Sequence, residues 1–282
     1  MGFLNRMGSR LGDRIRVHSL ASGSSGNCML IRSNGMNLLI DAGLSARAIE
    51  NHCRRLGVAI ESLSAILLTH EHSDHIQGAA TLARRAKAPI VGNSATLNAL
   101  RERSTADFPT LTLPTSSTIT LGETTVRSFP IPHNAVEPVG WVVESGQGRI
   151  AYATDVGSIT DDLREAVRGA QLVIIEANHD IRCLWHGSYS PQMKAQVASP
   201  VGHLSNEECA ELLAERMEEG TAATVWLAHL SRQNNAPSLA KRTIEERLAK
   251  QKCVPHRVEV AMRDQPSVSW RYGAQAFQMS LL

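Results

Sequence analysis

Residues 65–75 read AILLTHEHSDH, an apolar run followed by three histidines and an aspartate within six positions. The apolar part is typical of a short buried strand, and the residues after it predict a loop and then a helix that ends near Ala86. The polar side chains therefore begin where a strand ends. Loops held on such a scaffold often carry functional sites.

The chemistry of this stretch points to metal ions. Side chains alternate along an extended chain, so His70 and His72 are expected to point the same way, while Asp74 and His75 enter a helical turn and face a neighbouring point. Two imidazoles on one side, with a carboxylate and an imidazole on the other, would bind two adjacent cations. These ligands suit zinc or manganese, with iron as an alternative, and the lack of cysteine ligands favours a catalytic site. The competing interpretation is an ordinary polar surface loop.

Composition indicates the class of protein and its compartment. The 282 residues are 20% charged and 43% hydrophobic, which fits a globular protein and excludes a disordered tail, a collagen or a disulfide-stapled miniprotein. The five cysteines show no paired spacing, the N-terminal residues lack the apolar stretch of a signal peptide, and no apolar run approaches the roughly 18 residues of a membrane span. We therefore expect a cytoplasmic protein with no membrane partner.

Short strand-like runs alternate with helical ones along the chain. Strands are expected at residues 15–21, 28–33, 36–41, 65–69, 119–121, 125–131, 140–144, 149–154, 173–176, 224–229, 257–262 and 268–272. Helices are expected from Ser45 to Gly57, after the histidine motif, from the capping box at 205–208 to residue 219, and over Pro237–Lys250. Segments 104–118 and 183–202 are expected to be loops. Because no linker divides this pattern, we expect a single domain, residues 1–282, of class α/β or α+β, with residues 1–14 as a flexible arm.

The histidine stretch resembles the HxHxDH signature of the metallo-β-lactamase fold. That resemblance implies an αββα sandwich with a site at one edge. It also implies a further histidine after the middle strands, an aspartate at a strand end and a last histidine near the C-terminus. The chain offers these in order, in Pro132-His133-Asn134, Ala153-Thr154-Asp155 and Leu227-Ala228-His229. Each string lies at the end of an expected strand.

The same resemblance implies a role for each of these residues. One divalent metal ion would be held by His70, His72 and His133, and a second by Asp74, His75 and His229. Asp155 would bridge the two ions, and Asp41 would orient a ligand or a water molecule. Two such ions activate a hydroxide that attacks the substrate.

Two further residues, Glu176 and His203, complete the expected catalytic group with Asp41 and Asp74. They resemble a pair in the family's RNA-processing nucleases, in which the glutamate holds the histidine. A histidine held in this way is suited to assist the leaving oxygen of a phosphodiester. The resemblance therefore favours phosphodiesters among the substrates that this fold serves.

Longer strings carry a closer resemblance, to the YycJ (WalJ) group of that family. They are SGSSGN at 22–27, PHNA at 132–135, EANHD at 176–180, GHLSN at 202–206 and HLSRQNNAP at 229–237. This resemblance implies a metal-dependent 5′→3′ exonuclease that acts on the ends of double-stranded DNA, with a link to DNA repair. Asn134 departs from the aspartate expected after His133.

Several polar residues keep more than one interpretation. The SGSSGN turn is either a tight hairpin or a phosphate cradle. His179, Asp180 and His186 are surplus candidates that line the site or replace a misplaced ligand. The basic residues of the two N-terminal helices are interpreted as solvated helix faces rather than a DNA track; they are Arg54, Arg55, Arg84, Arg85 and Lys87.

Two rival functions stay open at this point. One is a hydrolase of the same fold that acts on a small substrate, a thioester or a cyclic phosphodiester. The other is a non-catalytic DNA-binding module. A missing ligand would favour the module, and none of the seven expected ligands is missing from the sequence.

Overall fold

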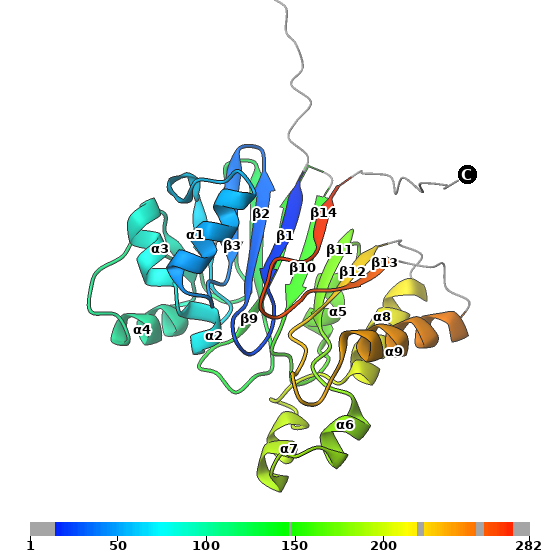
Figure 1. Ribbon diagram of the computed structural model, residues 1–282. Helices are drawn as coiled ribbons and strands as arrows, with labels where there is room; N and C mark the ends of the chain where they lie inside the picture. Colours follow the sequence, from blue (N-terminus) through cyan, green and yellow to red (C-terminus); the bar gives the residue numbers. More distant parts are fainter. Residues whose placement is uncertain (1–14, 147, 219–222, 252–256, 273–282) are drawn as a thin grey trace, which may run out of the picture.

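Two seven-stranded sheets, packed face to face and covered by helices on their outer sides, make up the computed structural model (Figure 1). It describes residues 15–146, 148–218, 223–251 and 257–272, so the expected flexible arm at 1–14 lies outside the described residues. Hydrophobic clusters fill the space between the sheets and the space under each helical layer. The expected αββα sandwich is confirmed.

The first sheet is built from the N-terminal part of the chain and closed by a C-terminal strand. Its order is β14-β1-β2-β3-β4-β5-β6. The strands are β1 (Arg16–Ala21), β2 (Cys28–Ser33), β3 (Met36–Ile40), β4 (Ala65–Leu67), β5 (Ile90–Gly92), β6 (Thr110–Thr112) and β14 (Ser269–Arg271). Its outer side carries α1 (Ala46–Arg55), η1 (Ile60–Ser62), α2 (Ser73–Ile76), α3 (Ala79–Ala86) and α4 (Ser94–Glu102).

The second sheet has the order β13-β12-β11-β10-β9-β8-β7. Its strands are β7 (Thr118–Leu121), β8 (Thr124–Pro130), β9 (Val139–Ser145), β10 (Gly148–Ala153), β11 (Leu172–Glu176), β12 (Thr224–Ala228) and β13 (Arg257–Val260). The helices α5 (Asp161–Val167), α8 (Asn206–Glu218) and α9 (Pro237–Lys250) cover its outer side, while α6 (Ile181–His186) and α7 (Pro191–Val197) project from one end (Figure 1).

Strand periodicity explains why both faces of each sheet are buried. Along β10, Ile150 and Tyr152 point into the core between the sheets, whereas Ala151 and Ala153 point into the core under the helices. Successive side chains of a strand point to opposite faces. Because apolar residues occupy both the odd and the even positions of β10, both faces of the sheet must be buried. No helix in the described part of the chain is long and apolar enough to cross a membrane.

Parallel pairing gathers several strand ends at one edge of the sandwich. In the first sheet β3 pairs in parallel with β4, and in the second β10, β11 and β12 pair in parallel with one another. The strand β8 runs in the same direction as β10, because both are antiparallel to β9. The residues that follow these six strands therefore meet at the same edge.

Two expected loops contain short regular elements. Segment 104–118 includes the strand β6, which pairs with β5, and segment 183–202 includes the end of α6 and the whole of α7. The helix α7 has no buried residue, so it lacks the periodic apolar pattern that predicts a helix. The prediction of loops was wrong at these places because the elements depend on capping and strand pairing rather than on an apolar stripe.

Candidate metal centre

The candidate site lies at the edge where the carboxyl ends of the parallel strands meet. Three of its residues lie at or just past the end of a strand and have positive φ angles. Asp41 directly follows β3 (φ 58°), His229 directly follows β12 (φ 52°), and Asp155 lies two residues past the end of β10 (φ 56°). This left-handed backbone is sparsely populated by residues other than glycine and often marks functional positions. It bends the chain sharply at the strand end and keeps these side chains at the edge.

The first expected ligand set is brought together. The ring of His70 lies 4.5 Å from that of His72 and 5.2 Å from that of His133, measured between centroids, and the His72 and His133 rings are also 5.2 Å apart. One ring nitrogen from each histidine lies within 4.8 Å of the others. His133 Nδ1 donates to the Gly202 carbonyl at 3.1 Å, which leaves its Nε2 to face the other rings.

The second expected set, Asp74, His75 and His229, meets the same distance criterion. Asp74 Oδ2 lies 3.5 Å from His75 Nε2 and 3.7 Å from His229 Nε2. Both histidines use Nδ1 elsewhere: His75 donates to Asp41 at 2.8 Å and His229 donates to Glu176 at 2.7 Å. A carboxylate behind each imidazole fixes the tautomer that leaves Nε2 for a metal ion.

Asp155 lies between the two sets. Its Oδ2 is 3.0 Å from His75 Nε2, and its Oδ1 is 3.6 Å from His133 Nε2. The same Oδ1 is also 3.5 Å from His229 Nδ1, so this carboxylate is in reach of histidines of both sets.

Unpartnered donor atoms test whether these residues fit metal ions. His70 Nε2 and His229 Nε2 are buried and have no hydrogen-bond partner. Buried polar atoms are rarely left without a partner, because each lost hydrogen bond costs about 1–3 kcal/mol. Imidazole nitrogens and carboxylate oxygens are also the donors that zinc and manganese accept. The residues therefore fit divalent cations.

Opposite charges dominate the electrostatics of the cluster. Burial lowers the pKa of His229, but Asp155 and then Asp74 and Glu176 raise it to about 10. Burial likewise opposes protonation of His75, and the Asp41 and Asp155 carboxylates raise its pKa well above the usual value. These carboxylates create a field that holds protons on two histidines. The same field attracts divalent cations, which displace such protons when they bind.

Glu176 and His203, the pair expected to assist the leaving group, are in direct contact. His203 Nδ1 donates to Glu176 Oε1 at 2.9 Å, and Glu176 Oε2 accepts from the backbone nitrogens of Val156 and Leu204. Burial lowers the pKa of His203, and Glu176 raises it above its ordinary value. Unlike fully buried Glu176, the His203 side chain is 22% exposed, so it can reach a substrate.

Sequence reasoning missed several residues that support the centre. Asn27 Nδ2 lies 3.0 Å from His75 Nε2, and Ser22 Oγ accepts from the His229 backbone nitrogen at 2.9 Å. The SGSSGN turn therefore packs against the candidate ligands as well as joining β1 to β2. Thr69 donates to Asp41 through both its backbone nitrogen and its hydroxyl. The signal that pointed to the turn was its polar composition, but that pattern does not reveal which side chains face inward.

The three surplus candidates lie outside the ligand sets found among the described residues. Asp180 caps α6 by accepting from the Cys183 backbone nitrogen at 2.8 Å. His186 is exposed at the end of the same helix. His179 is buried, and its Nδ1 has no hydrogen-bond partner; burial lowers its pKa.

Comparisons with known proteins agree with this geometry. A family model described as a beta-lactamase superfamily domain matches residues 36–230. Exodeoxyribonuclease YycJ of Bacillus anthracis is 36% identical over 230 residues, which cover 80% of this chain and 86% of that protein. Exodeoxyribonuclease WalJ of Streptococcus pneumoniae is 36% identical over 234 residues, which cover 82% of this chain and 87% of that protein.

A solved structure supports the fold. The metallo-β-lactamase fold protein YhfI of Bacillus subtilis matches with a TM-score of 0.69 at 19% identity, over 92% of this chain and 99% of its own. The family model covers more than half of the sequence, and the two exodeoxyribonucleases match most of it at well over 30% identity. The chain therefore belongs to the metallo-β-lactamase superfamily and, within it, to the YycJ/WalJ family.

Proposed function

We propose that this protein is a dinuclear-metal phosphodiesterase, a 5′→3′ exonuclease that acts on the ends of double-stranded DNA. The names of the two similar proteins support a nuclease with a DNA substrate. The observation that carries the proposal is the convergence of seven metal-type side chains from both sheets beside the Glu176–His203 pair.

The proposal assigns a ligand set to each ion. His70, His72 and His133 would hold one ion, and Asp74, His75 and His229 would hold the other. Asp155 would be a ligand shared by the two sets. Zinc or manganese fits these donors, with iron as an alternative. When bound, two such cations supply Lewis acidity and a nucleophile derived from water at neutral pH.

The protein's own residues position these ligands and move a proton. Asp41 and Glu176 hold the imidazoles of His75 and His229 through Nδ1, so Nε2 points toward the centre. We therefore assign Asp41 a positioning role. Asp74 would contribute a carboxylate to the centre, and its side chain is 21% exposed to solvent.

His203 is the general acid in this proposal. Glu176 occupies its Nδ1 and favours the protonated ring, which leaves Nε2–H to donate to the oxygen that departs from phosphorus. Proton transfer from a positioned histidine accelerates such a step by about 10²–10⁴-fold. A role in DNA repair and a cytoplasmic location belong to the same proposal.

The test uses purified protein and a duplex oligonucleotide labelled in turn at its 5′ and 3′ ends. With Mn²⁺ we expect mononucleotides or short products to be released from the 5′ end. EDTA and the His72→Ala substitution should each abolish this release, because both remove an ion from the centre. Cleavage by His72→Ala at more than a few per cent of the parental rate, with full metal content, would contradict the ligand assignment.

A second set of substrates separates the rival functions. If the parental protein holds two metal ions by elemental analysis but leaves duplex DNA intact, the DNA assignment is wrong. Hydrolysis of a cyclic nucleotide or of single-stranded RNA by the same sample would then identify the alternative phosphodiester. Retention of bound DNA with no turnover of any substrate would instead indicate a binding module.

A further inference from the structure

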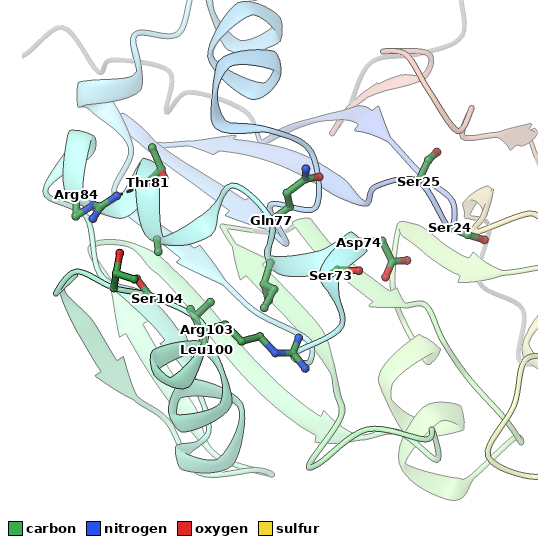
Figure 2. Close-up of a pocket in the computed structure, with 13 residues that line it drawn as sticks. Ser24, Ser25, Ser73, Asp74, Gln77, Thr81, Arg84, Leu100, Arg103 and Ser104 are labelled. Carbon is green, nitrogen blue, oxygen red and sulfur yellow. Dashed lines mark hydrogen bonds between the residues drawn. The ribbon is translucent and has the colours of Figure 1, made fainter.

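A polar pocket of about 560 Å³ adjoins the candidate metal centre and shares Asp74 with it. Figure 2 shows Asp74 and Ser73 beside this pocket, with Ser24 and Ser25 toward one end and Arg84, Thr81 and Ser104 toward the other. The lining comes from the SGSSGN turn, α2, α3 and the end of α4. The pocket is therefore open to solvent beside one of the candidate ligands.

The charged side chains that line the pocket are basic, except for the candidate metal ligand Asp74. Asp74 is its single acidic lining residue, and two arginines, Arg84 and Arg103, line it as well. Within the described part of the chain neither arginine has an acidic partner, and Arg84 makes one long contact of 3.5 Å to the Thr81 hydroxyl. The next residue, Arg85, differs because it forms an ion pair with Glu50 and lines a separate pocket.

Arg103 connects the pocket to the histidine loop. Its Nη1 donates to the carbonyl of Glu71, which stands between His70 and His72. The Glu71 carboxylate in turn accepts from the Val136 backbone nitrogen at 3.1 Å, close to His133. The guanidinium is therefore held beside the loop that carries two of the candidate ligands, and its other N–H groups remain for a ligand in the pocket.

The lining chemistry suits phosphate and sugar groups. Guanidinium groups match phosphate oxygens, and the Ser24 hydroxyl is a donor of the kind that contacts nucleic-acid backbones. The Ser25 and Ser104 hydroxyls donate within the protein, to Asp264 and to the Ala106 carbonyl. No aromatic side chain lines the pocket in the described residues, so it lacks the platform on which bases stack. Its volume falls within the roughly 300–1,000 Å³ of ligand sites.

We infer that this pocket binds the sugar-phosphate backbone of the nucleic-acid strand next to the scissile phosphate, with Arg84 and Arg103 contacting backbone phosphates. The inference rests on the proposed function, because it requires a nucleic-acid substrate. It also changes the interpretation of Arg84. This residue is exposed, as a solvated helix face predicts, but it borders the path of the substrate. Arg85, paired with Glu50, fits the solvated face.

The test compares Arg84→Gln with Arg84→Lys and with the matched control Arg85→Gln. Binding of a fluorescein-labelled duplex oligonucleotide is measured by anisotropy in EDTA over a series of salt concentrations, and cleavage kinetics are measured in Mn²⁺. We expect Arg84→Gln to weaken binding about fivefold and to reduce the slope of log K against log salt concentration by about one. In the cleavage kinetics, we expect KM to rise while kcat changes little. Arg84→Lys should restore most of the binding, and Arg85→Gln should match the parental protein.

Equal binding by Arg84→Gln and Arg85→Gln would overturn the inference. If the parental protein still cleaves duplex DNA in that case, the proposed function stands and only the pocket assignment fails. If the parental protein neither binds nor cleaves duplex DNA, while hydrolysing bis(p-nitrophenyl) phosphate, the DNA function fails and the pocket assignment fails with it.

Discussion

Glu176 is the residue on which two tasks of the site depend. Its Oε1 lies 2.9 Å from His203 Nδ1 and 2.7 Å from His229 Nδ1, so one carboxylate oxygen holds the proposed acid and a proposed metal ligand. Burial raises the pKa of Glu176, but the two histidines lower it to about 2. The carboxylate is therefore ionised throughout the neutral range, and removing its charge should affect both partners.

We expect Glu176→Gln to reduce both metal affinity and turnover, and His203→Ala to reduce turnover alone. Glu176→Gln should lower metal affinity about 10–100-fold, because His229 loses its oriented partner, and turnover should fall with it. His203→Ala should keep its metal while losing about 10²–10⁴-fold in turnover. Metal content by mass spectrometry and kcat for duplex DNA measure the two effects.

A leaving group that needs no proton provides the control. With p-nitrophenyl thymidine phosphate, the turnover of His203→Ala should approach the parental rate. The turnover of Glu176→Gln should stay low when the metal concentration is limiting. Equal defects of His203→Ala on both substrates would argue against its role as general acid.

The raised pKa values of His75 and His229 predict the pH dependence of the metal-stripped protein. His229 has a pKa of about 10 when folded and about 6.5 when unfolded. A group with the higher folded pKa binds more protons in the folded state, so its stabilisation is complete below about pH 6.5 and is lost as the pH rises toward 10. The free energy of unfolding in EDTA should therefore fall from neutral to alkaline pH. Urea unfolding at several pH values checks this, and a smaller slope is expected for His229→Asn; a flat profile would refute it.

At the scale of elements, close packing between a loop and a helix places Asp74 and His75. Gly43 follows β3, and a Cβ atom there would lie 1.5 Å from the Asp74 carbonyl oxygen. The same contact carries backbone hydrogen bonds from Asn27 to Asp74 and from Ala42 to His75, both 2.8 Å long. A side chain at position 43 would have to displace α2.

Gly43→Ala should therefore damage one metal set while the sandwich persists. We expect the loss of about one metal equivalent and at least a tenfold drop in turnover, a magnitude typical of displaced ligand support. Gly92→Ala in β5 is the control, because its added Cβ meets Leu97 at an ordinary 3.7 Å. Metal analysis and circular dichroism test the pair. Full metal binding by Gly43→Ala would show that α2 adapts.

The sequence predicts elements well where an apolar pattern or a cap carries them. The strands β2 and β3 and the helix α9 appear at or within one residue of their expected bounds. The strands β5 and β6 are three residues each and are defined by pairing with β4 and with each other, which no local pattern reveals. The candidate site follows the same rule. The motifs indicate its candidate ligands, which the structure brings together, whereas the contacts of Asn27, Ser22 and Arg103 depend on tertiary packing.

At the scale of the whole molecule, each proposed ligand set draws on both sheets. His70, His72, Asp74 and His75 follow β4 of the first sheet, whereas His133 and His229 follow β8 and β12 of the second. In this proposal each ion would connect the two halves of the sandwich. Because these candidate ligands come together only in the folded chain, metal binding there would add directly to its stability.

Metal removal should consequently destabilise the whole fold. An ion present at 100 times its Kd contributes about 2.7 kcal/mol, which raises the Tm of a protein of this size by about 5 °C or more. Scanning calorimetry with saturating Mn²⁺ or Zn²⁺, and with EDTA, measures the difference. His72→Ala and His229→Ala should each lose part of the metal-dependent shift, and the double variant should lose all of it, because each removes a ligand from a different set. An unchanged shift in the double variant would show that the stabilising ions bind elsewhere.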